Sequence, residues 1–174
     1  MALDSGKVRS GFGKLIDQVA VQFAIAIEML RSIDDEAYAH VEDGGSIGKH
    51  IRHNLNFLEA VLAGIGSGRI DYAARSRDVR IETNRSFAIA KIEEVLDALR
   101  GLSESFNRNV TVVSEADPAI VHSSTISREI EFALSHTIHH HAIIRRMLND
   151  AGSELAADFG VAPSTLEYWR RRVE

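Results

Sequence analysis

Apolar residues recur every three or four positions over four long stretches of this chain, and that spacing is typical of amphipathic helices. Only two prolines occur, and both lie outside these stretches. Glycines or polar capping residues lie near the ends of the stretches, where helices commonly stop or start. We therefore expect helices over residues 11–33, 47–65, 127–149 and, beginning at Thr83 or Asn84, to about residue 100.

Together these elements predict an all-α fold, a four-helix bundle with a short C-terminal helix that begins near Pro163. The length of 174 residues is ordinary for one domain with one core, so we expect a single domain over residues 1–174. Only residues 110–113, which are β-branched, favour a short extended segment.

The connection over residues 69–82 is rich in charge and includes Arg75, Arg77 and Arg80. A salt-bridged crossover that packs across the bundle is one interpretation. The other is a loop that faces a substrate, because an arginine there could bind a carboxylate or a phosphate.

Composition excludes several classes of function. The chain has no cysteine, which rules out disulfides, thiolate metal ligands and a cysteine nucleophile. The net charge is −5, and the arginines at 170–172 are best explained as the end of a helix, so we expect no nucleic-acid partner. No stretch reaches the roughly 18 apolar residues of a membrane span, and residues 1–7 lack a signal-peptide pattern. These features favour a cytoplasmic protein that does not enter a membrane.

Four of the eight histidines lie within six residues of the last long helix, at positions 136, 139, 140 and 141. Residues four apart share a helix face, so His136 and His140 can bind one metal ion. On a helical wheel this pair points inward with the apolar residues, His139 lies at the margin, and His141 points away towards solvent or an interface. Burying two imidazoles without partners is costly, and a metal ion would supply the partner.

A third histidine on the second helix, His50 or His53, would complete the site. Three neutral imidazoles suit Zn²⁺ or Ni²⁺ best, with Fe²⁺ also possible. Three protein ligands leave positions open for water or a substrate, which is typical of catalytic sites. The zinc-protease motif does not fit, because Thr137 occupies the position of its glutamate. Glu129, two turns before His136, is a candidate for acid–base work.

The histidine motifs and their order resemble those of the DinB/YfiT-like superfamily of bacterial metal-binding four-helix bundles. The segments concerned are Ser46-Ile47-Gly48-Lys49-His50-Ile51-Arg52-His53 on the second helix and His136-Thr137-Ile138-His139-His140 on the fourth. The resemblance covers most of the chain. It implies that His53, His136 and His140 are the metal ligands, although the wheel places His50 nearer the centre of its apolar stripe.

What the resemblance implies about function is less specific. Similar proteins include transferases that act with low-molecular-weight thiols, a related domain in sulfoxide synthases, and many members without an assigned activity. Homodimers are common among them. We therefore expect a metal-dependent thiol transferase or hydrolase, and as the alternative a dimeric bundle that the metal only stabilises.

Overall fold

A computed structural model describes residues 10–42, 44–74, 76–152 and 155–172 of the chain. The N-terminal segment, Arg75 and the end of the chain lie outside the described residues. Four long helices form the body of the molecule: α1 (Gly11–Ser32), α3 (Ile47–Ser67), α5 (Arg85–Arg100) and α6 (Ile126–Asp150). The predicted all-α bundle is confirmed, and each long helix begins and ends within two residues of its expected limits.

Polar side chains fix where the long helices begin. Ser46 accepts a hydrogen bond from the backbone N–H of Lys49 at the start of α3, and Asn84 and Thr125 do the same for α5 and α6. Such a cap satisfies a backbone donor that the helix itself cannot pair. These caps thus fix where α3, α5 and α6 begin.

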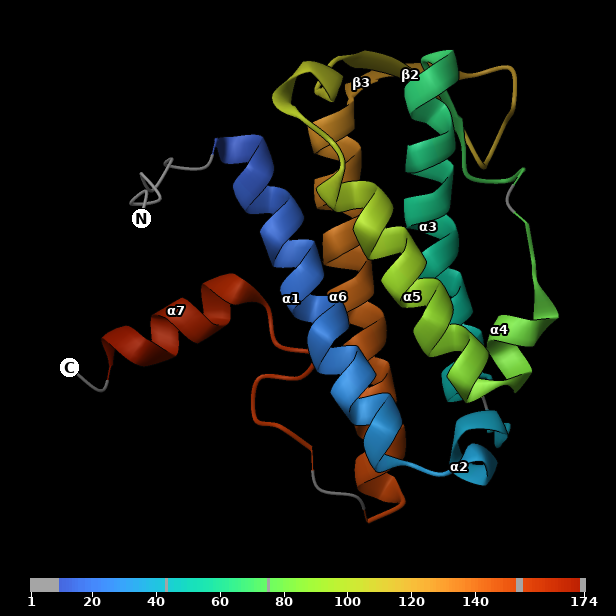
Figure 1. The fold of residues 1–174 in the computed structure, drawn as a ribbon, viewed down its shortest axis with the longest axis vertical. Helices are drawn as coiled ribbons and strands as arrows, with labels where there is room; N and C mark the ends of the chain where they lie inside the picture. Colours follow the sequence, from blue (N-terminus) through green and yellow to red (C-terminus); the bar gives the residue numbers. More distant parts are fainter. Residues whose placement is uncertain (1–9, 43, 75, 153–154, 173–174) are drawn as a thin grey trace, which may run out of the picture.

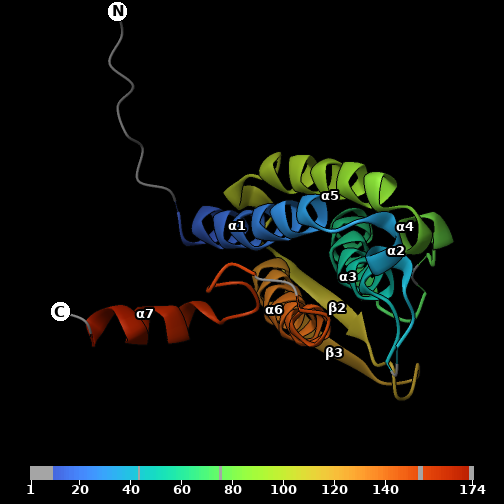
Figure 2. The ribbon, with the colours of Figure 1, turned by 90° about the horizontal axis from the view of Figure 1, so that it is seen from below.

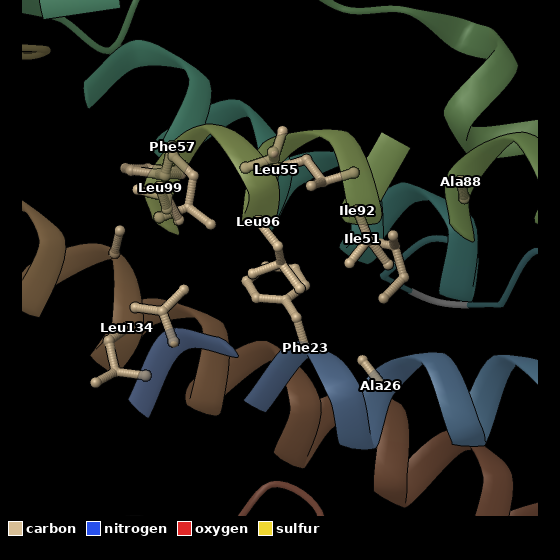
Figure 3. Close-up of a cluster of buried hydrophobic side chains, with 14 of the residues drawn as sticks. Phe23, Ala26, Ile51, Leu55, Phe57, Ala88, Ile92, Leu96, Leu99 and Leu134 are labelled. Carbon is tan, nitrogen blue, oxygen red and sulfur yellow. The ribbon is translucent and has the colours of Figure 1, made fainter. Parts of the chain in front are cut away.

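The helices surround one apolar core (Figures 1 and 2). Both α1 and α3 pack against α5 and α6, so the core lies where the four helices face one another. Phe23 of α1 is 1% exposed and reaches towards Leu96 of α5 and Leu55 of α3 (Figure 3). No helix among the described residues is long and apolar enough to cross a membrane.

A small sheet at one end of the bundle was only partly predicted (Figure 1). Its strands are β1 (Arg69–Asp71), β2 (Asn109–Val113) and β3 (Val121–Thr125), in the order β1-β2-β3. β1 is parallel to β2, with Ile70 opposite Val112, and β3 is antiparallel to β2, with Ser123 opposite Thr111. Only β2 carries the β-branched signal found in the sequence.

Short helices complete the fold: α2 (Asp35–Ala39), α4 (Val79–Thr83), the 3₁₀ turn η1 (Glu104–Phe106) and α7 (Pro163–Arg171). α4 packs closely on α3, because a Cβ at Gly48 would lie 2.0 Å from the Glu82 carbonyl oxygen. Within the connection over residues 69–82, Arg77 is exposed and Arg80 pairs with Asp78 at 2.6 Å. The described part of this connection therefore contains a salt bridge, as the first interpretation expects.

Candidate metal centre

The structure brings His53, His136 and His140 together between α3 and α6. The Nε2 atom of His136 lies 2.8 Å from Nε2 of His53 and 3.1 Å from Nε2 of His140. One ring nitrogen from each of the three lies within 4.8 Å of the other two. All three side chains are half-buried, so the cluster sits at the edge of the core rather than inside it.

This arrangement could hold a metal ion. Nitrogens bound to one tetrahedral Zn²⁺ at 2.0–2.1 Å are separated by roughly 3.3 Å. The observed separations of 2.8 and 3.1 Å are close to that value. Three Nε2 atoms that face one another cannot all be satisfied by sharing protons, whereas one cation accepts a lone pair from each. The donor set therefore fits a borderline divalent ion.

His50 lies one turn before His53 and contacts the ring nitrogen of His140 that does not face His136. Its Nδ1 is 2.8 Å from Nδ1 of His140, and its side chain is 7% exposed. If Nε2 of His140 offers its lone pair to the centre, the ring proton must sit on Nδ1 of His140. That N–H then donates to Nδ1 of His50. His50 thus orients His140, while His53 supplies the nitrogen that faces the centre.

Burial keeps the imidazoles of His140 and His50 neutral. Loss of solvent, followed by the nearby rings of His136, His53, His50 and His139, lowers the pKa of His140 to about 3. Burial, with Lys49 and His139 as smaller causes, also lowers the pKa of His50. Neutral imidazole is the form that binds metal ions, so protons compete weakly for His140 at neutral pH.

Aromatic rings line one side of the cluster. The ring of Phe57 lies 4.4 Å from that of His136 and 5.0 Å from that of His53, and Phe132 is stacked on His136 at 5.9 Å. Phe57 is itself 3% exposed. This wall restricts the half-buried imidazoles and lowers the local polarity, which strengthens electrostatic interactions at the centre.

Glu129 is buried, but its oxygens are engaged elsewhere. One accepts a hydrogen bond from the Tyr72 hydroxyl at 2.6 Å and the other from the Ser124 hydroxyl at 2.5 Å. Phe57 contacts both Tyr72, which donates to this carboxylate, and His136 of the cluster. Burial, followed by the hydrogen bond to Glu129, raises the pKa of Tyr72. The Tyr72–Glu129 hydrogen bond thus links the residue after β1 to helix α6.

We expect Tyr72→Phe to lower the free energy of unfolding by at least about 1 kcal/mol, because Glu129 would keep only one donor while it stays buried. Urea unfolding measures the change. Tyr168→Phe is the matched control, since Tyr168 is 57% exposed, and it should shift the midpoint little. Equal effects of the two substitutions would contradict a stabilising role for the Tyr72–Glu129 bond.

The expectation for His141 was wrong. Its side chain is fully buried, stacked on Phe159 with ring centroids 4.9 Å apart and edge-on to Phe23. The buried stripe of α6 runs through Thr137 and His141, which are polar residues at its centre. His136 and His140 therefore flank the stripe, whereas His139 is exposed. Sequence reasoning also missed Tyr72, which follows β1 in a charged connection and shows no periodic signal.

Comparison with known proteins supports the fold. No family model matches the sequence. The chain is similar to the crystal structure of a DinB-like protein, YjoA, from Bacillus subtilis, with a TM-score of 0.64. That likeness covers 86% of this chain and 99% of the other, at 16% sequence identity.

A curated relative, FK506-binding protein 5 from Rhizopus delemar, is 26% identical over 108 residues. The match covers 59% of this chain but 28% of that protein, so the chain spans little more than a quarter of the relative's length. The structural likeness, by contrast, covers most of this chain and nearly the whole of the solved protein. The chain therefore has the DinB-like fold.

Proposed function

We propose that His53, His136 and His140 hold a divalent metal ion, Zn²⁺ or Ni²⁺ in the first place and Fe²⁺ in the second. The observation that carries this proposal is the convergence of three Nε2 atoms from two helices. The support of His140 by His50 and the wall formed by Phe57 and Phe132 are consistent with it. Metal-bound histidines usually have such a hydrogen-bonded partner behind them.

The function that this site supports best is that of a metal-dependent transferase or hydrolase. A bound ion would act as a Lewis acid and lower the pKa of a coordinated thiol or water. The chain's own part is to supply three neutral nitrogens and leave the remaining coordination positions open. A low-molecular-weight thiol is the proposed co-substrate. Because such thiols are kept reduced in the cytosol, the proposal also places the protein there.

A second candidate is a non-catalytic bundle in which the ion only stabilises the fold of a homodimer. The position of the cluster favours it, because His53 belongs to α3 while His136 and His140 belong to α6. An ion there would clamp two core helices together and stabilise the folded state by mass action.

Metal analysis of protein purified without an affinity tag tests both candidates. We expect about one equivalent of a divalent ion per chain, because three ligands form one site. Metal-free and metal-loaded protein are then compared for loss of free thiol in the presence of an electrophilic acceptor, and for melting temperature. Metal-dependent thiol consumption supports the enzyme, and a raised melting temperature without it supports the structural role. Protein that binds no ion when loaded would exclude both.

The role of His50 gives a separate prediction. We expect His50→Ala to weaken metal binding by about 10- to 100-fold, the usual effect of losing the partner behind a metal-bound histidine. Isothermal titration of the metal-free protein measures the affinity, and its melting curve shows separately whether the substitution harms the fold. His122→Ala, at an exposed position on β3, is the control. Unchanged affinity in His50→Ala would contradict the orienting role.

A further inference from the structure

Helix α7 is an amphipathic helix that the structure leaves without a partner surface. It extends away from the bundle (Figures 1 and 2), and none of its nine residues is buried. Tyr168 is 57% exposed and Trp169 is 47% exposed, and Leu166 lies on the same face as Trp169. A helix this short is marginal in water unless it packs against something. Its apolar face therefore indicates a docking surface elsewhere.

The root of α7, residues 157–160, is fixed to the bundle. Arg145 donates hydrogen bonds to the carbonyls of Ala157 and Phe159, at 3.1 and 3.0 Å. Phe159 is 1% exposed. Gly160 has φ +70°, and a Cβ there would lie 2.6 Å from the backbone nitrogen of Ala142. From this fixed root α7 leads away from the bundle as an arm (Figures 1 and 2).

An apolar groove of about 660 Å³ lies beside the root of this arm, between α1 and the segment that precedes α7. Its floor includes Ile25, Ile27 and Phe159, and Ala24 lies on its exposed side. Val21, one turn earlier on α1, is 48% exposed and continues the apolar face. The groove contains none of the clustered histidines, so it is separate from the metal centre.

The charges of arm and groove are complementary. Three acidic residues line the groove, namely Glu28, Glu93 and Asp158, together with one arginine, Arg31, which pairs with Glu28 and Glu93. The arm ends in Arg170, Arg171 and Arg172, and its one acid, Glu167, pairs with the first two. Each surface thus keeps an excess of opposite charge, which favours association of arm with groove.

We propose that α7 docks into the groove of a second copy of this chain, so that two chains exchange arms. Arm and groove lie next to each other in one chain. A two-fold axis between two copies can then place each arm over the other's groove and make the contact twice, as in other isologous dimers. This assembly does not depend on the metal centre, and it assigns a surface to the homodimer proposed above.

The only tryptophan of the chain, Trp169, lies on the arm and reports docking directly. We expect a dimer in sedimentation velocity, with tryptophan emission shifted to the blue. Dilution should dissociate the dimer and move the emission to the red over the same concentration range. Ala24→Glu in the groove and Trp169→Ala on the arm should each raise the dissociation constant about tenfold or more. Ala63→Glu, at an exposed position of α3 outside the groove, should not.

Mixing the two defective variants gives the sharpest test. The arm of Ala24→Glu is intact and the groove of Trp169→Ala is intact, so a mixed dimer keeps one complete contact. All tryptophan emission comes from Ala24→Glu, and it should shift to the blue when Trp169→Ala is added. Circular dichroism establishes that both variants are folded.

Three results would overturn the proposal. The first is a monomer at every concentration. The second is a dimer that Ala24→Glu does not weaken and whose tryptophan stays exposed. The third is a blue-shifted emission that is independent of concentration but lost in Ala24→Glu, which would show that the arm docks in its own groove.

Discussion

Replacing His140 by alanine is expected to weaken metal binding by about a thousandfold or more. Sites built from protein side chains bind zinc with roughly 10–16 kcal/mol, so one ligand in three or four supplies on the order of 4 kcal/mol, which corresponds to a factor of about a thousand. His140 is also the ligand that His50 orients. Competition with a chromophoric chelator measures the affinity, and metal content after dialysis gives an independent check.

His139→Ala is the matched control for this substitution, because His139 is adjacent in sequence but exposed. His141→Ala is unsuitable, since the fully buried ring of His141 supports the core and its loss would affect the fold. Circular dichroism should show the same helix content for both variants. Comparable losses of affinity in His139→Ala and His140→Ala would mean that the cluster does not bind a metal through the nitrogens that converge in the structure.

The long helices were predictable because their signals are local. Caps such as Ser46 and Asn84 lie at the helix starts, and Gly68 and Gly101 follow the helix ends. The sheet lacked such signals. β1 is three residues long, and β3 consists mainly of polar residues that are exposed or half-buried. Both strands owe their conformation to pairing with β2, a contact between distant parts of the chain that periodicity does not report.

The residues that form the site could be predicted from the sequence better than their positions relative to the core. His53, His136 and His140 do come together, but the structure places the pair on α6 beside the buried stripe rather than on it. Hydrophobic periodicity assigned the stripe incorrectly because Thr137 and His141, both polar, occupy its centre. It also could not separate His50 from His53, since α3 packs against α4, α5 and α6 and its buried face is correspondingly wide.

The second large effect that we expect is a loss of stability at acid pH, and its cause is the buried side chain of His141. Burial lowers its pKa to about 3, and both ring nitrogens lack hydrogen-bond partners among the described residues. The folded protein therefore keeps His141 neutral, whereas the unfolded chain takes up a proton below its ordinary pKa of about 6.5. Stability from this group is complete above that pH and falls as the pH drops towards 3. Between pH 7 and pH 5 the loss is about 2 kcal/mol.

His141→Phe keeps an aromatic ring against Phe159 and removes the titrating nitrogens, so this part of the acid loss should disappear. Urea unfolding of metal-free protein gives the free energy of unfolding at pH 7 and at pH 5. The change between the two pH values is then compared between wild type and His141→Phe, so that any effect of the larger ring on packing cancels. The other buried histidines remain in both proteins and cancel as well. His122→Phe, at an exposed site, should leave the pH dependence as it is in the wild type. If His141→Phe loses as much stability as the wild type between the two pH values, the folded protein must admit a proton to His141, by local opening or by water that reaches the ring.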